Sequence, residues 1–108
     1  MTFVWRSLLY VPAHVEKFVN SPRVGEADGV ILDLEDSVPA ERKTQARDMA
    51  SAAVQTLSQR RGDVLVRIND DPALAAADIA AVVRPGVRAL VAPKVRGVDH
   101  VDELGRLI

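Results

Sequence analysis

The chain has 108 residues, 48% of them apolar, and its 14 basic and 15 acidic side chains leave a net charge of −1. This length suits about one small domain with a hydrophobic core, and no basic stripe indicates a nucleic-acid interface. No apolar stretch approaches the roughly 18 residues of a membrane span. The segment MTFVWRSLLYVP has no charged n-region and no cleavage site of small residues, so we expect no signal peptide. The absence of cysteine excludes disulfides and thiolate metal sites and fits a cytoplasmic protein.

Short apolar runs alternate along the chain with stretches of helical periodicity. Nearly uninterrupted runs of Val, Ile and Leu are typical of strands buried on both faces, as in a parallel sheet. The pattern predicts strands at 7–11, 29–34, 63–69 and 87–93, separated and followed by helices at 14–20, 39–60, 72–83 and from about 99. This strand–helix alternation predicts an α/β fold with parallel strands and right-handed crossovers.

The sequence predicts four strand–helix units, half the number in a (β/α)₈ barrel. A (β/α)₈ barrel needs eight strand–helix units and about 250 residues. Four units predict either a small open sheet or the front half of something larger. We expect residues 1–108 to be the N-terminal half of a barrel, apparently truncated.

The stretch GVILDLEDSVP places three carboxylates at the end of the second predicted strand. Side chains alternate along a strand, so Asp33 and Glu35 share one side. Arg67 lies near the end of the third strand, on the same side as Leu65 and Asn69, and Lys94 follows the fourth strand. Ligands of parallel α/β sheets bind at these carboxyl ends. We therefore expect Arg67 and Lys94 to neutralise Asp33 and Glu35 at a shared site.

Taken together, RSLLYVPAHVEKF, GVILDLEDSVPAERKTQAR, VRIN and VAPKV resemble the HpcH/HpaI aldolase and citrate lyase beta-subunit family. The resemblance runs from Arg6 to about Val95, with four motifs in the order and spacing of the family. It implies a TIM barrel that uses Mg²⁺ to cleave or form a carbon–carbon bond next to an acyl-CoA thioester, with a keto acid as the other product. Substrates of the citryl-, citramalyl- or malyl-CoA type all remain open, as do cleavage, condensation and thioester hydrolysis.

The resemblance also implies roles for individual residues. Arg67 matches the arginine that binds the substrate carboxylate, a task suited to a guanidinium fork. Tyr10 and Lys17 match residues that contact the CoA-bearing substrate, and Glu35 and Asp36 match catalytic acids near the metal. These five residues are therefore the predicted site.

The direct metal ligands that the resemblance implies are not among these residues. In the family they are a glutamate after strand five and an aspartate after strand six. Both positions would lie beyond Ile108, because the present sequence provides only four predicted strands. We therefore expect no metal ligand, and no activity, in these 108 residues alone.

Two other interpretations and one departure accompany this resemblance. VILDLEDSVP is also similar to the phospho-acceptor strand of a signalling receiver domain, although the first strand lacks the acidic pair that such a domain needs. A non-catalytic half barrel that self-associates as a homo-oligomer is the third interpretation. Relatives often have an acid where this chain has Arg96, which leaves the pairing around Lys94 open.

Overall fold

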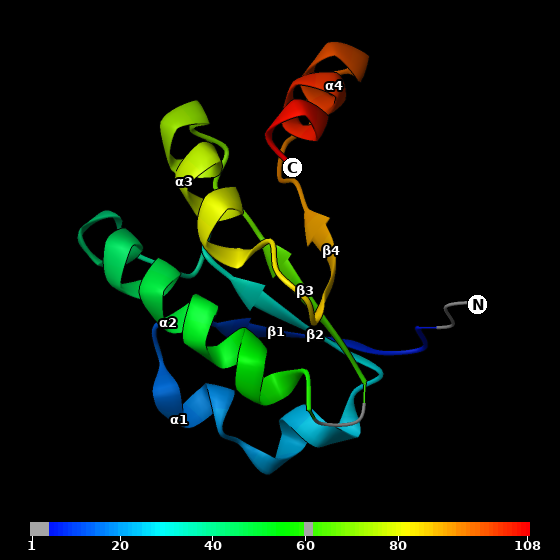
Figure 1. Ribbon diagram of the computed structural model, residues 1–108. Helices are drawn as coiled ribbons and strands as arrows, with labels where there is room; N and C mark the ends of the chain where they lie inside the picture. Colours follow the sequence, from blue (N-terminus) through cyan, green and yellow to red (C-terminus); the bar gives the residue numbers. More distant parts are fainter. Residues whose placement is uncertain (1–4, 60–61) are drawn as a thin grey trace.

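The computed structural model describes residues 5–59 and 62–108. Strand and helix alternate along the chain, and short 3₁₀ segments at Pro22–Glu26 and Ala40–Arg42 precede β2 and α2 (Figure 1). The elements are β1 (Leu8–Pro12), α1 (Glu16–Val19), β2 (Gly29–Asp33), α2 (Lys43–Leu57), β3 (Asp63–Arg67), α3 (Pro72–Val82), β4 (Val87–Val91) and α4 (Val98–Leu107). The predicted α/β alternation is thereby confirmed. None of the helices in these ranges combines the length and apolar character that a membrane span requires.

The four strands form one parallel sheet in the order β1-β2-β3-β4. Each strand is added next to its predecessor, and the order never reverses. Doubly wound sheets reverse their strand order at a switch point, whereas barrels add strands in sequence. The topology is therefore consistent with the N-terminal part of a TIM barrel, and it differs from that of a receiver domain.

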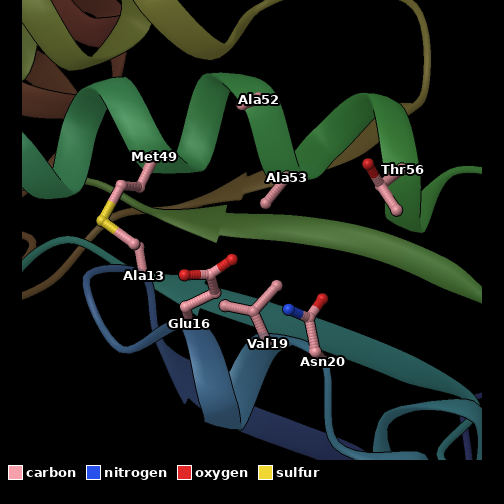
Figure 2. A pocket seen from close by; sticks show the side chains of 8 residues that line it. All are labelled: Ala13, Glu16, Val19, Asn20, Met49, Ala52, Ala53 and Thr56. Atoms are coloured by element: carbon pink, nitrogen blue, oxygen red, sulfur yellow. The ribbon is translucent and has the colours of Figure 1, made fainter.

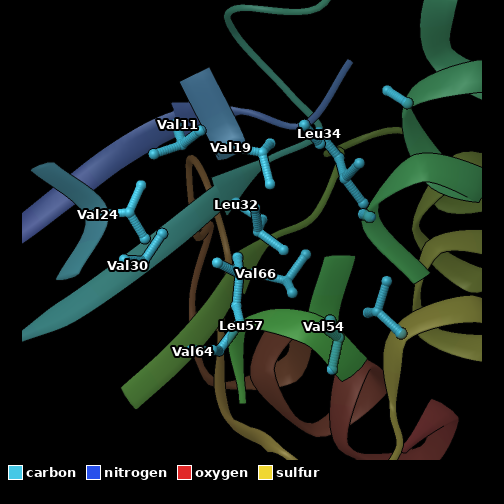
Figure 3. Close-up of a cluster of buried hydrophobic side chains, with 14 of the residues drawn as sticks. Val11, Val19, Val24, Val30, Leu32, Leu34, Val54, Leu57, Val64 and Val66 are labelled. Atoms are coloured by element: carbon cyan, nitrogen blue, oxygen red, sulfur yellow. The ribbon is translucent and has the colours of Figure 1, made fainter. Parts of the chain in front are cut away.

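One face of the sheet carries the main hydrophobic core (Figure 3). Alternate strand residues such as Val30, Leu32, Val64 and Val66 are buried there. They pack against the apolar side of α2, which buries Ala46, Ala50, Val54 and Leu57. The period of two along the strands and of 3.6 along the helix brings these side chains into a single layer.

The opposite face carries Tyr10, Ile31, Asp33, Leu65 and Arg67. Tyr10 is 49% exposed, and Leu8 beside it is 43% exposed. Within the described ranges β1 and β4 each pair with a single strand, so both outer edges of the sheet are open. This face and these edges are where a barrel would continue.

The structure shortens several predicted elements. Strands expected at 29–34 and 63–69 end at Asp33 and Arg67. The helix expected over 39–60 has a 3₁₀ turn first and then runs over Lys43–Leu57; its expected end at residue 60 lies outside the described residues. Because the chain leaves the strand after Arg67, strict alternation stops there. The prediction that Asn69 lies on the same side as Arg67 is therefore wrong. The side chain of Asn69 instead donates a hydrogen bond to Asp78 on helix α3.

Candidate functional site at the carboxyl ends of the strands

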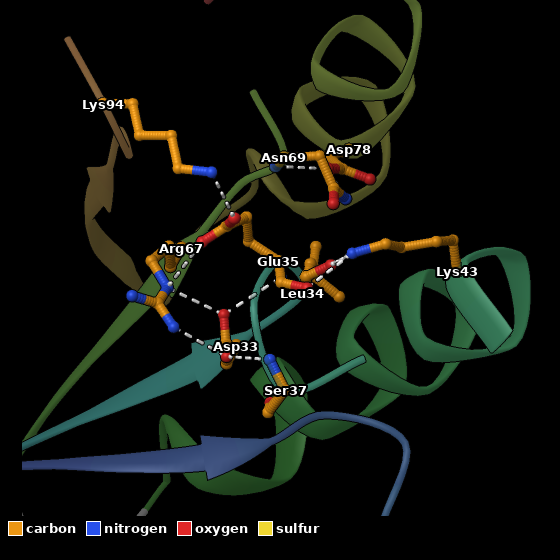
Figure 4. Close-up of polar contacts among 9 residues, drawn as sticks. All are labelled: Asp33, Leu34, Glu35, Ser37, Lys43, Arg67, Asn69, Asp78 and Lys94. Atoms are coloured by element: carbon orange, nitrogen blue, oxygen red, sulfur yellow. Dashed lines mark hydrogen bonds and ion pairs between the residues drawn. The ribbon is translucent and has the colours of Figure 1, made fainter. Parts of the chain in front are cut away.

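The centre of the site is an ion pair between two neighbouring strands (Figure 4). Arg67 Nε donates to Asp33 Oδ1 and Arg67 Nη2 to Asp33 Oδ2, both at 2.8 Å. Asp33 and Arg67 are register partners at the last positions of β2 and β3. Parallel pairing therefore brings the two side chains together, and the planar guanidinium matches both carboxylate oxygens.

Asp33 also accepts two backbone hydrogen bonds. The N–H of Glu35 donates to Oδ1 and the N–H of Ser37 to Oδ2, each at 3.0 Å. Burial opposes ionisation of this carboxyl, but the Arg67 guanidinium and the two N–H groups outweigh it and hold the pKa of Asp33 well below its ordinary value. The hydrogen bonds to Asp33 in turn raise the pKa of Arg67. Asp33 is thus a fixed anion that shapes the loop after β2.

Glu35 is held more loosely, between two cations. Its Oε1 lies 3.7 Å from Arg67 Nε and its Oε2 lies 3.8 Å from Lys94 Nζ. Both separations exceed the usual hydrogen-bond range of about 2.7–3.2 Å for N–H···O. The expected neutralisation of Asp33 and Glu35 by Arg67 and Lys94 is confirmed, with one tight ion pair at Asp33 and two loose ones at Glu35.

Tyr10 covers the guanidinium from β1. Its ring centroid lies 4.6 Å from Arg67 Cζ, a stacking distance for a cation on an aromatic face. Asp33 takes the Nε and one Nη of Arg67. Among the described residues Nη1 has no hydrogen-bond partner, so the outer edge of the fork is available to a ligand.

Two side chains hold the loops around the site. Lys43 Nζ donates to the carbonyls of Leu34, at 3.0 Å, and Glu35, and so ties the loop after β2 to the start of α2. The buried Asp78 carboxylate accepts from the backbone and side chain of Asn69 at 2.9 and 2.7 Å, and from Arg47 Nε at 2.9 Å. The loop after β3 is thereby fixed to α2 and α3.

Among the described residues, neither Lys17 nor Asp36 takes part in the hydrogen bonds and ion pairs of this cluster. Lys17 Nζ lies 5.3 Å from the ring centroid of Phe18 on α1, and no contact joins it to Arg67 within the described ranges. Asp36 is exposed in the loop after β2. Arg96 pairs with Asp70 at 2.7 Å and so links the loop after β4 to the loop after β3. Arg96 therefore does not disturb the contact between Lys94 and Glu35.

Sequence reasoning missed the anchoring role of Asp78. Asp78 occupies an inward position of α3, next to Ile79, and is fully buried. A lone acid inside the alanine-rich stretch PALAAADIAAV is the signal that could have found it, because a buried carboxylate needs partners.

A separate groove between α1 and α2 has a cavity volume of about 350 Å³ (Figure 2). It is lined by Ala13, Glu16, Val19, Asn20, Met49, Ala52, Ala53 and Thr56. Glu16 is the one ionisable side chain in this lining, and none of the polar cluster at the strand ends takes part. The groove therefore offers space without the convergent charges of the strand ends.

A parallel α/β sheet whose strands follow in sequence order, with an arginine, acids and a lysine at their carboxyl ends, is consistent with barrel-type enzymes, whose active sites lie at this edge. The chain belongs to the HpcH/HpaI aldolase/citrate lyase family, whose model matches residues 6–108. The receiver-domain interpretation is therefore wrong.

Individual relatives agree with this assignment. The chain is 37% identical over 104 residues to the citrate lyase subunit beta of Escherichia coli K12 and 33% identical over 104 residues to that of Leuconostoc mesenteroides subsp. cremoris. It is 31% identical over 105 residues to a (3S)-malyl-CoA thioesterase of Cereibacter sphaeroides ATCC 17025. These alignments cover 95–96% of this chain and 34–37% of each relative. The chain thus spans about a third of the length of these relatives.

The described residues do not by themselves fit a magnesium site. Residues 5–59 and 62–108 contain no group of three or more His, Asp or Glu side chains that could hold a metal ion. Both oxygens of Asp33 already accept hydrogen bonds from Arg67 and from backbone N–H groups. Glu35 faces two cations, which oppose the binding of another positive ion. That the direct metal ligands lie beyond Ile108 stays a prediction.

Proposed function

We propose that the protein containing this chain is a carbon–carbon lyase that acts on the CoA thioester of a hydroxy acid and releases a keto acid. The family and its relatives, which are named as citrate lyase subunits and malyl-CoA thioesterases, support an enzyme acting on CoA esters. The observation that carries the proposal is the Arg67 fork, fixed by Asp33 and Tyr10 with its outer edge open. Its partners are expected to be acyl-CoA and keto-acid small molecules.

Arg67 is proposed to bind the carboxylate at the acid end of the substrate. Asp33 occupies one edge of the guanidinium, and Tyr10 covers one face. Only the outer edge therefore remains for a ligand, and this sets the direction from which a carboxylate can approach. A fixed direction orients the bond to be broken and contributes to the rate.

The proposed reaction breaks the carbon–carbon bond next to the hydroxyl-bearing carbon. The hydroxyl loses its proton and becomes the carbonyl of the keto acid, while the bond electrons pass to the thioester half, which then takes up a proton. Glu35 is proposed to exchange a proton with the ligand, because neither neighbouring cation hydrogen-bonds its carboxylate. Asp36 is proposed as a second acid at this loop, and Tyr10 and Lys17 as contacts of the CoA portion. Mg²⁺ remains part of the proposal through the family alone, and no step here depends on it.

The experiment that tests this function replaces Arg67 by lysine in the gene product that contains residues 1–108. We expect kcat/KM for malyl-CoA and citryl-CoA to fall by about 10²-fold or more, because a point charge cannot reproduce the fork. The matched control is Arg88→Lys, since Arg88 also faces an aspartate, Asp63, but at the opposite end of the sheet. Unchanged kcat/KM for every accepted ester in a folded Arg67→Lys protein would refute the carboxylate-binding role.

A further inference from the structure

Lys94 has an unusual backbone conformation and a weakly paired ammonium group. It has φ of 50°, the only positive φ of a non-glycine residue within the described ranges. The left-handed region is unfavourable for residues with a Cβ, and such conformations concentrate at functional sites. Lys94 directly follows Pro93, in the loop after β4. A glycine would adopt this backbone conformation without steric cost, yet the chain has a lysine here.

The ammonium group of Lys94 is also weakly engaged. Its side chain is 74% exposed, and its ion pair within the described ranges is the 3.8 Å contact with Glu35. Figure 4 shows the side chain extending from the end of β4 toward Glu35, on the far side of that carboxylate from Arg67. Two cations therefore flank one loosely held acid.

The loop that carries Lys94 is held in place. Arg96, two residues further along, reaches Asp70 at 2.7 Å, and its backbone N–H donates to Nδ1 of His100. The strained backbone of Lys94 thus lies between β4 and an anchored turn. The backbone of Lys94 is consequently held by the fold, and the exposed side chain reaches toward Glu35 from this position.

We propose that Lys94 recognises a second anionic group of the ligand whose first carboxylate binds Arg67. This inference rests on the proposed function and predicts that, among the possible substrates, acids that carry two carboxylates at the acid end are preferred. The outer edge of Arg67 takes one carboxylate. The second replaces Glu35 as the counter-ion of Lys94, which costs little because the existing contact is longer than a hydrogen bond.

The test compares two stable acids that differ in a single group. (S)-malate has a carboxylate where (S)-2-hydroxybutyrate has a methyl group, and calorimetry gives the affinity ratio of the two acids for each variant of the gene product. Lys94→Met is expected to lower the preference for malate by about three- to tenfold, as for a partly exposed ion pair. Binding of 2-hydroxybutyrate is expected to stay within about twofold, because that acid offers Lys94 no anion.

Two further variants separate charge recognition from general effects. Lys94→Arg is expected to restore most of the preference, whereas Arg88→Met, which removes a positive charge from the other end of β4, is expected to leave it unchanged. Lys94→Gly is expected to lose the preference and to raise the thermal midpoint, since glycine relieves the positive φ.

The outcomes distinguish the inference from the function beneath it. If neither acid binds to the wild type, the proposed carboxylate site is wrong. The same holds if the Arg67→Lys variant binds both acids with wild-type affinity. In either case the inference about Lys94 is refuted as well. If both acids bind through Arg67 but Lys94→Met keeps the wild-type preference, only the role of Lys94 is refuted, and Lys94 serves merely to neutralise Glu35. An equal loss of preference in Arg88→Met would also refute it, because a general charge effect would then explain the result.

Discussion

At the scale of single residues, Asp33 determines the geometry of the site more than any acid around it. It orients Arg67 through two hydrogen bonds and closes the following loop through two backbone N–H groups. Glu35, in contrast, is half-buried and has only loose contacts with two cations, and Asp36 is exposed to solvent. The acid that binds most partners is therefore structural, and the looser acids are the candidates for chemistry.

Asp33→Asn is expected to lower the free energy of unfolding by about 2–3 kcal/mol, because it removes the hydrogen-bonded counter-ion of the half-buried Arg67 and leaves the looser contact with Glu35. The pKa of Asp33 is lowered in the folded state, so its contribution is present above the unfolded pKa of about 3.9. The difference between wild type and variant should therefore shrink as the pH falls below about 4. Urea unfolding at several pH values measures this.

The control for Asp33 is Asp48→Asn, since Asp48 is an exposed acid on α2. We expect that variant to stay within about 0.5 kcal/mol of wild type. A difference between wild type and Asp33→Asn that persists undiminished at pH 2 would contradict the assignment to the ionised carboxylate.

Lys17→Met is expected to weaken binding of an acyl-CoA about two- to fivefold while leaving the free acid unaffected, as for a solvent-exposed phosphate contact. The effect should decrease as salt is added, because ions screen exposed charges. Calorimetric titration of the gene product with both ligands at two salt concentrations checks this. Arg23→Met, which removes a charge from the neighbouring 3₁₀ segment, is the control; equal losses for the acid and its CoA ester would remove the CoA role of Lys17.

At the scale of elements, the helices differ in how firmly they join the core. Helix α2 buries four side chains against the sheet, whereas α4 buries none completely. Leu104 of α4 packs against the small cluster of Ile68, Ala75 and Ile79, but Val98 and Val101 remain 76% and 53% exposed. The apolar side of α4 is thus only partly used within the described chain.

Native-state hydrogen exchange is expected to show this difference. Amides of α4 should exchange at lower opening free energies than those of α2, because fewer buried contacts must be broken to open α4. Mass spectrometry of peptides covering 43–57 and 98–107 provides the measurement. Equal protection of both peptides in the isolated 108-residue chain would mean that α4 is stabilised by a surface other than α3.

At the scale of the whole molecule, the sheet is open on both sides. The edges of β1 and β4 are unpaired within the described ranges, and Leu8 and Tyr10 expose apolar surface on the face that lacks helices. Open strands of this kind pair with other chains. In the proposed enzyme, further strands of a barrel would cover these open edges and the exposed apolar face. In the isolated 108-residue chain, the same edges and face would favour homo-oligomers.

The isolated chain is therefore expected to sediment above its monomer mass of 11.7 kDa, with an average mass that rises with concentration. Introducing a charge at the open edge, as in Leu8→Lys, should reduce this association because edge charges oppose strand pairing. Ser7→Lys, directly outside β1, serves as a control for added charge at the same end. A concentration-independent monomer would refute self-association of the half barrel.

The amino-acid sequence by itself determined the order of strands and helices and the meeting of Asp33 with Arg67. Both follow from local periodicity and from the rule that carboxyl ends of parallel strands share one edge. The tertiary structure alone decided that Asn69 turns to Asp78, that Arg96 reaches Asp70, and that Lys94 adopts a left-handed backbone. These contacts depend on where each chain segment leaves its strand and on which loops then lie side by side, and neither is encoded in a repeating pattern.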